Sequence, residues 1–165
     1  MKDVVIGKGK LAGKGVFAAR GFEKGELVMS YNLKPLTHAE FDSLPKSEQM
    51  FVHSFWGKMY LFPEPSRYTN HSANPNTISD LDKMCDYALK RIRKGEMITT
   101  NATREIQNEL ETFVEAYEKT KPINFRWLSG GYRNAVISYS KTNNTRKILQ
   151  LQRINGNWHI ISEQK

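Results

Sequence analysis

The segment Arg67–Asn76 reads Arg-Tyr-Thr-Asn-His-Ser-Ala-Asn-Pro-Asn, and it says more about the fold of this 165-residue chain than any other stretch. Asparagine, serine and proline favour turns, because their side chains bond the local backbone or fix φ. A loop this polar, with His71 at its centre, is either a surface connection or a binding site. Two other segments, one upstream and one downstream, bear on that choice.

The upstream segment is glycine-rich. Gly13-Lys14-Gly15 leads into the short apolar run Val16-Phe17-Ala18. Glycine allows positive φ and lets a ligand approach the backbone closely. The third glycine and the following helix of a dinucleotide-binding fingerprint are missing. The pair therefore indicates a tight turn or a backbone contact with a ligand.

The downstream segment repeats a charged pattern. Lys24-Gly25-Glu26 and Lys94-Gly95-Glu96 are each followed by apolar residues. This is the pattern of a turn that leads into a strand.

Taken in this order, the three segments resemble the SET-domain protein-lysine methyltransferases. The family signature R-F-I-N-H-S-C-x-P-N is matched by residues 67–76, with Tyr68, Thr69 and Ala73 as departures, and the family's G-E-E-L-T is matched by residues 95–99. The likeness covers residues 3–104 and resembles the small, bacterial-type members that lack cysteine-rich zinc modules.

The resemblance implies a mainly β (α+β) fold. Small curled sheets of the β-clip type would be joined by a pseudoknot, in which the chain end threads beneath a loop. Residues 3–104 would form the SET domain, with residues 36–66 as an insert. The many short strands with glycine and proline turns agree with this class.

The implied activity is methyl transfer from S-adenosylmethionine to a lysine amine of a protein substrate. Tyr31 and Tyr68 are the candidate catalytic residues. The candidate cofactor-binding residues are Lys14, Gly15, Arg67, Asn70 and His71. No metal site is expected, because no second His, Asp or Glu stands at ligand spacing from His71.

One departure from the family concerns the chemistry. Members continue G-E-E-L-T with two residues and then a catalytic tyrosine, but here Ala102 occupies that place. One interpretation is an enzyme with reduced or altered activity, in which another tyrosine takes the place of the missing one. A non-catalytic SET-fold binding module is the alternative.

The elements expected from pattern alone are mostly strands. Thr37-His38-Ala39-Glu40 has the form of a capping box, which predicts a helix from His38. A second helical piece is expected over residues 47–56, with Met50, Phe51 and Phe55 facing inward. Strands are expected at residues 4–6, 15–18, 27–31, 58–62, 77–81, 84–92 and 97–99.

The texture changes beyond Arg104. Apolar residues at helical spacing predict a helix over residues 106–119 that packs on the core or on a partner chain. Strands at 134–140, 146–154 and 158–161 follow, with Asn155-Gly156 as a hairpin turn. Residues 105–165 are thus a helix plus a three-strand appendage, weakly similar to a fragment of a nuclear-transport-factor-type domain. Self-association through this segment is left open.

Composition narrows the class of protein. The single cysteine excludes an internal disulfide framework. Neither a signal peptide nor a membrane span is evident, so a cytoplasmic protein is expected. The net charge of +8 is spread along the chain. Nucleic acid is therefore not expected as a partner, and His38, His53 and His159 are expected to stand alone as surface or packing residues.

Overall fold

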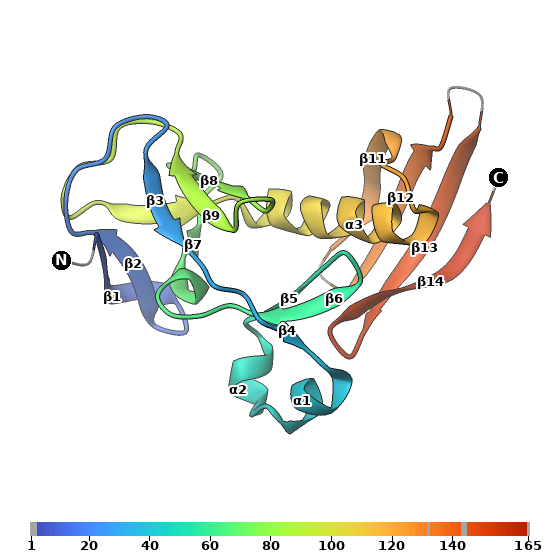
Figure 1. Cartoon of the computed structure of the whole chain (residues 1–165), viewed down its shortest axis with the longest axis horizontal. Helices are drawn as coiled ribbons and strands as arrows, with labels where there is room; N and C mark the ends of the chain where they lie inside the picture. Colours follow the sequence, from blue (N-terminus) through green and yellow to red (C-terminus); the bar gives the residue numbers. More distant parts are fainter. Residues whose placement is uncertain (1–2, 132, 143–144, 165) are drawn as a thin grey trace. The chain divides into compact units, whose positions relative to one another are not determined.

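The computed structural model describes residues 3–131, 133–142 and 145–164, which divide into two compact units (Figure 1). The first unit holds the chain up to Leu33 together with Phe62–Glu105. The second holds Lys34–Leu61 together with the chain from Ile106 onward. The chain therefore crosses between the units three times.

Two small sheets form the first unit, with strand orders β1-β2-β10-β7 and β3-β9-β8. The elements are β1 (Val4–Leu11), β2 (Lys14–Ala18), β3 (Leu27–Ser30), the short 3-10 helix η1 (Ser66–Tyr68), β7 (Asn70–His71), β8 (Thr77–Asp80), β9 (Cys85–Ala88) and β10 (Met97–Thr100). The mainly β class is confirmed, and each strand expected in this unit is present. The strand expected at residues 84–92 is shorter than predicted, because β9 ends at Ala88.

The repeated Lys-Gly-Glu pattern marks two matching turns. Gly25 and Gly95 have nearly the same positive φ, 83° and 84°, which glycine adopts without strain. Between the two segments, Phe22 and Ile92 exchange both backbone hydrogen bonds at 2.9 Å. Both side chains are buried, at 1% and 0% exposed. The repeated sequence pattern thus corresponds to a repeated turn, and the two segments that contain it pack against each other.

Strand β10 is the last strand of the first unit and lies between two earlier ones. It pairs antiparallel with β2 and parallel with β7, where Thr99 lies opposite Asn70 and Thr100 opposite His71. Its Ile98 is fully buried. This pairing brings the signature segment and the glycine-rich hairpin into one sheet.

The second unit contains the sheets β4-β6-β5 and β11-β12-β13-β14. Its elements are β4 (Pro35–Leu36), α1 (His38–Ser43), α2 (Lys46–Gln49), β5 (Val52–Phe55), β6 (Lys58–Leu61), β11 (Ile123–Gly130), β12 (Asn134–Ser140), β13 (Arg146–Ile154) and β14 (Asn157–Gln164). Helix α3 (Ala102–Glu118) begins with the last residues of the first unit and continues into the second.

Helix α1 begins as its sequence predicts. The Thr37 hydroxyl accepts from the Glu40 amide at 3.2 Å, and the Glu40 carboxylate accepts from the Thr37 amide at 2.7 Å. This is a complete capping box, which satisfies amides that the helix itself leaves open.

The helix expected over residues 47–56 is wrong in most of its length. Helix α2 ends at Gln49, and Val52–Phe55 is strand β5, paired with β6. Trp56 and Gly57 have φ of 49° and 70°, so they form a two-residue hairpin turn that the apolar spacing concealed. Of the three side chains expected inward, Phe51 and Phe55 are buried, whereas Met50 is 49% exposed.

The C-terminal segment packs α3 against a four-stranded antiparallel sheet (Figure 1). The strands at 134–140 and 146–154 and the hairpin turn at Asn155-Gly156 are confirmed. The shared core consists of Leu110, Val114, Ala135, Ile137, Tyr139, Leu149, Leu151 and Trp158. Strand β11 was not anticipated, because it is irregular, with two register shifts against β12 and a positive φ at Asn124.

A buried carboxylate ties α3 to the insert and to the sheet within the second unit. Glu109 is fully buried and forms an ion pair with Arg153. The His53 ring nitrogen Nδ1 lies 2.9 Å from its Oε1, and the Trp158 indole donates to its Oε2 at 3.3 Å. The expectation that His53 stands alone is therefore wrong.

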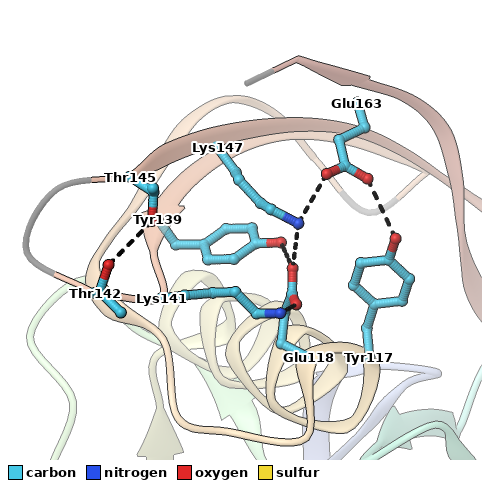
Figure 2. A network of polar contacts seen from close by, with 8 residues as sticks. All are labelled: Tyr117, Glu118, Tyr139, Lys141, Thr142, Thr145, Lys147 and Glu163. Atoms are coloured by element: carbon cyan, nitrogen blue, oxygen red, sulfur yellow. Dashed lines mark hydrogen bonds and ion pairs between the residues drawn. The ribbon is translucent and has the colours of Figure 1, made fainter.

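A second polar network closes the C-terminal end of α3. Figure 2 shows Lys147 between two carboxylates, with its ammonium 2.8 Å from both Glu118 Oε1 and Glu163 Oε1. The Tyr139 hydroxyl donates to Glu118 at 2.6 Å, and Lys141 forms an ion pair with the same carboxylate.

In the part of the chain that the structure describes, no helix combines the length and apolarity needed to cross a membrane.

Candidate functional site

The glycine-rich segment is a β-hairpin. Strands β1 and β2 are joined by Ala12 and Gly13, whose φ values are 52° and 74°. Two consecutive residues of positive φ match the right-handed twist of the flanking strands. A Cβ added at Gly13 would meet no atom within 4 Å, so one side of the hairpin tip is open.

The Asn70 side chain joins this hairpin to the signature segment. Its Oδ1 accepts from the Lys10 amide at 2.7 Å and from the Leu11 amide at 3.3 Å. Its Nδ2 donates to the carbonyls of Lys14 and Tyr68 at 2.9 and 2.8 Å. The side chain is buried, and both donors and the acceptor oxygen are used. Two segments far apart in sequence are therefore fixed together by one amide.

Gly15 lies directly against this amide. A Cβ built at Gly15 would come within 3.3 Å of both Asn70 Nδ2 and the Gly9 Cα, closer than ordinary van der Waals contact. The second glycine of the Gly-x-Gly is thus required by close packing. Its backbone is buried against the Asn70 amide and the adjacent strand.

Three side chains gather beside the hairpin. The Lys14 ammonium lies 4.4 Å from the centre of the Tyr68 ring and 3.1 Å from its hydroxyl. That hydroxyl donates to Glu64 Oε1 at 2.7 Å, and the same oxygen lies 3.7 Å from the ammonium. The Tyr68 ring is buried, whereas the Lys14 and Glu64 side chains are about half exposed, at 46% and 52%. The hydrogen bond that Lys14 donates to the Tyr68 hydroxyl, assisted by Glu64, raises the pKa of Lys14.

His71 follows Asn70 and contacts the start of α3. Its Nδ1 accepts from the Ala102 amide at 3.0 Å. A neutral ring in this arrangement carries its proton on Nε2. Asn101 caps the helix, since its Oδ1 accepts from the amides of Thr103 and Arg104 at 3.1 and 3.3 Å. Ala102 is therefore the first residue of a capped helix.

Asn76, the last residue of the signature, secures β10. Its Oδ1 accepts from the Thr99 amide at 2.8 Å, and its Nδ2 donates to the Met97 carbonyl at the same distance. The side chain is 3% exposed. Sequence reasoning assigned no role to this asparagine, although the signature match contained it.

Tyr31 and Arg67 each contact Phe62, Tyr31 at its ring and Arg67 at its carbonyl. The Tyr31 and Phe62 rings lie 5.3 Å apart, and Arg67 Nε donates to the Phe62 carbonyl at 2.8 Å. The structure thus brings Lys14, Gly15, Tyr68 and Asn70 into direct contact. It places His71 beside them, and it places Tyr31 at the end of β3.

The Tyr31 hydroxyl has a partner that sequence reasoning missed. It donates to Asp86 Oδ1 at 2.9 Å, and the Ser79 hydroxyl donates to the same oxygen at 2.7 Å. Asp86, in β9, is 4% exposed, and the preceding Cys85 is 3% exposed. An aspartate in a short run of otherwise apolar strand residues was the available signal.

Burial dominates the ionisation of this pair. It raises the pKa of Asp86 to about 6, against the opposing effect of the two hydroxyl donors, and Glu105 raises it further. Burial and the nearby Asp86 charge raise the pKa of Tyr31 far above its usual range. Tyr31 therefore stays protonated at neutral pH, whereas Asp86 changes its protonation close to neutral pH.

Among the described residues, no cluster of three or more His, Cys, Asp or Glu could hold a metal ion.

Comparison with known proteins gives consistent matches. The sequence profile of the family described as SET domain matches residues 13–101. The histone-lysine N-methyltransferase EZH2 of Chaetomium thermophilum is 28% identical over 142 aligned positions, which span 72% of this chain and 9% of that relative. This chain is thus much shorter than the relative it matches.

Two solved structures share the fold. One is ctPRC2 in an autoinhibited state, with a TM-score of 0.50 and 25% identity over 73% of this chain and 18% of the other. The second is a humanised mutant of the Chaetomium thermophilum Polycomb Repressive Complex 2 bound to an inhibitor. It also has a TM-score of 0.50 and 25% identity, over 63% of this chain and 15% of the other.

Proposed function

Because the chain belongs to the SET domain family, we propose that it transfers a methyl group from S-adenosylmethionine to a lysine amine of a protein. The observation that carries this proposal is the Asn70 amide, which holds the glycine hairpin against the signature segment. The EZH2 relative, named as a histone-lysine methyltransferase, supports a protein as the substrate class.

The residues at the hairpin fit the cofactor. The tip of the hairpin at Gly13 is exposed and open, so a ligand can approach its backbone. Lys14 offers a positive charge for a carboxylate, beside the aromatic face of Tyr68. Lys14, Gly15, Arg67, Asn70 and His71 would hold the cofactor together. In this arrangement Asn70 contributes by fixing the hairpin, since its hydrogen bonds are already made within the chain.

The chemistry asks for a neutral amine. S-adenosylmethionine supplies an electrophilic methyl carbon, whose bond to sulfur breaks, with the electron pair staying on sulfur, as the amine lone pair forms the new N–C bond. A lysine amine has an ordinary pKa of about 10.4, so the ammonium must lose a proton before it can attack. A channel that excludes water lowers that pKa, and alignment of the reacting atoms lowers the barrier. Tyr31 and Tyr68 are the hydroxyls proposed to line this path.

The test is cofactor binding by titration calorimetry, compared between the native chain and Asn70→Ala. The variant loses the four hydrogen bonds that join hairpin and signature, so we expect S-adenosylhomocysteine affinity to fall at least tenfold. Asn74→Ala is the matched control, because Asn74 lies in the same loop and is exposed. Absence of binding by the native chain would remove the proposal, and equal affinities in both variants would remove the role of Asn70.

A second function is favoured by one observation. Ala102 begins α3 and donates its amide to His71, so the position of the family's catalytic tyrosine carries no hydroxyl. A SET-fold module that binds without transferring methyl groups would have this property. Labelled methyl groups appearing on lysine-rich peptides would eliminate this alternative.

A further inference from the structure

The chain must remove a proton from its substrate without the family's tyrosine, and a buried tyrosine–aspartate pair stands in the same unit. Tyr31 donates to Asp86 at 2.9 Å. The start of α3 is linked to both parts of the site. Ala102 donates its amide to His71, and the charge of Glu105, three residues later, acts on Tyr31 and Asp86.

We propose that Asp86 is a positioning residue that orients the Tyr31 hydroxyl and, through it, takes up the proton that the substrate lysine loses. This inference rests on the proposed methyl transfer. One ammonium N–H bond breaks as its proton passes to the Tyr31 oxygen, and the former hydroxyl proton passes to Asp86 Oδ1. The nitrogen keeps the electron pair, Asp86 becomes a carboxylic acid, and its proton later returns to solvent by the same hydroxyl.

Three groups around the carboxylate make it a suitable acceptor. Ser79 and Tyr31 both donate to Oδ1, which fixes its orientation. Burial, and to a smaller extent the charge of Glu105, disfavour the ionised form, so this carboxylate holds a proton more readily than an exposed aspartate does. Tyr31 alone does not serve as the base at neutral pH, because burial beside Asp86 keeps its hydroxyl protonated. A lysine amine in a desolvated channel can have a pKa of about 5–6, which nearly balances transfer to Asp86.

The first test is the pH profile of methyl transfer from labelled S-adenosylmethionine to a set of lysine-rich peptides. For the native chain we expect kcat to rise through an acidic limb near pH 6 and then to level off, because Asp86 must be ionised to accept a proton. Asp86→Asn keeps the shape of the side chain and its hydrogen-bonding oxygen. It should lower kcat by about 10²–10⁴-fold, abolish the limb, and leave S-adenosylhomocysteine affinity within about twofold.

Ser79→Ala is the matched control. It removes a hydrogen bond to the same oxygen and leaves the contact between Tyr31 and Asp86 intact. The Ser79 donor lowers the pKa of Asp86, so in this variant the limb should move to higher pH while remaining visible. A purely structural role of Asp86 would lower kcat in Asp86→Asn and leave the limb in place, and this result would overturn the inference.

The second test needs no turnover. Carbon-13 NMR of chain labelled at aspartate carboxyls should show one carboxyl that titrates near pH 6 and is missing in Asp86→Asn. In Tyr31→Phe its pKa should rise, since a donor is lost. Titration of Asp86 near its ordinary value of about 3.9 would overturn the inference whatever the activity. If the native chain binds cofactor and transfers no methyl group, the proposed function fails and the proton-transfer role falls with it. If transfer occurs and Asp86→Asn keeps the native profile, only the inference fails.

Discussion

At the scale of single residues, the contact between Gly15 and Asn70 sets the geometry of the candidate cofactor site. Gly15→Ala puts a methyl group within 3.3 Å of the Asn70 amide and of the neighbouring strand. Such overpacking costs about 1–3 kcal/mol. We expect a lower thermal midpoint and at least tenfold weaker binding of S-adenosylhomocysteine, measured by calorimetry.

Gly13→Ala is the control for that prediction. Gly13 has φ of 74° and open space around its Cβ position, so the substitution costs backbone strain of about 1 kcal/mol without displacing Asn70. Its affinity should stay much closer to the native value. If the two variants bind alike, the close approach of Gly15 does not shape the site.

The motifs of the sequence predicted which residues lie together, whereas the roles of these residues in binding and catalysis stay predictions. The signature and the Gly-x-Gly were placed in one region by their family match, and Lys14, Gly15, Tyr68 and Asn70 do touch. Asp86 was not predicted as a site residue, because its role depends on its burial and on its contact with Tyr31, 55 positions away. No spacing rule within one sequence connects two such residues.

At the scale of elements, the network at the end of α3 couples the helix to its sheet. Burial alone would raise the pKa of Glu118, but hydrogen bonds from two lysines and a tyrosine outweigh it and lower the pKa to about 2. Lys147 in turn has its pKa raised by the hydrogen bonds that it donates to Glu118 and Glu163. Figure 2 shows that these side chains come from α3, β12, β13 and β14 or the residues next to them.

Glu118→Gln is expected to lower the free energy of unfolding by about 1–3 kcal/mol at pH 7, because buried partners lose their counter-charge. The pKa of Glu118 is depressed in the folded state relative to about 4.3 in the unfolded chain. Its stabilising effect is thus present above pH 4.3 and lost as pH falls toward 2. Urea denaturation of both proteins should show their difference shrinking over that interval.

Glu115→Gln is the comparison, since it removes the same charge from the same helix one turn earlier. We expect a change below about 0.5 kcal/mol. Equal losses in both variants would mean that the charge of the helix, and not the network, stabilises it.

Elements were predicted well where a local signal was strong. The capping box at Thr37 and the Asn155-Gly156 turn each specify backbone geometry directly. Strand β5 was missed because its apolar residues also fit a helical spacing, and pairing with β6 decided the outcome. Strand β11 depends on the sheet it joins, so its own residues give little warning.

At the scale of the whole molecule, the insert as far as Leu61 shares one unit with the C-terminal segment from Ile106 onward. Ser54 donates to Asn157 at 2.8 Å, and Glu109 bonds both His53 and Trp158. Gly156 comes so close to Met59 and Phe41 that a Cβ there would lie 2.9 Å from the sulfur. We propose that residues 3–104 act as a SET domain with residues 36–66 as insert, and that residues 105–165 support that insert.

Glu109→Gln tests this arrangement. Removing one charge from a buried ion pair costs about 3–5 kcal/mol, because Arg153 keeps its own charge in the interior. All three tryptophans, Trp56, Trp127 and Trp158, belong to the second unit, so their fluorescence reports on it. We expect their unfolding midpoint in urea to fall.

Combining Glu109→Leu with Arg153→Met provides the control. Replacing both members of the pair by apolar groups leaves neither charge without its partner, so much of the stability should return. If the single variant unfolds at the native midpoint, the cluster does not hold the insert to the C-terminal segment.

The single cysteine of the chain, Cys85, offers a chemical probe beside the candidate proton acceptor Asp86. Cys85 is buried immediately before Asp86 on the central strand of its sheet, so an alkylating reagent can attack it only when that sheet transiently opens. Each such event also wets the adjacent carboxylate. The rate of Cys85 alkylation therefore reports how often water reaches Asp86. A ligand that stabilises the closed sheet should lower this rate.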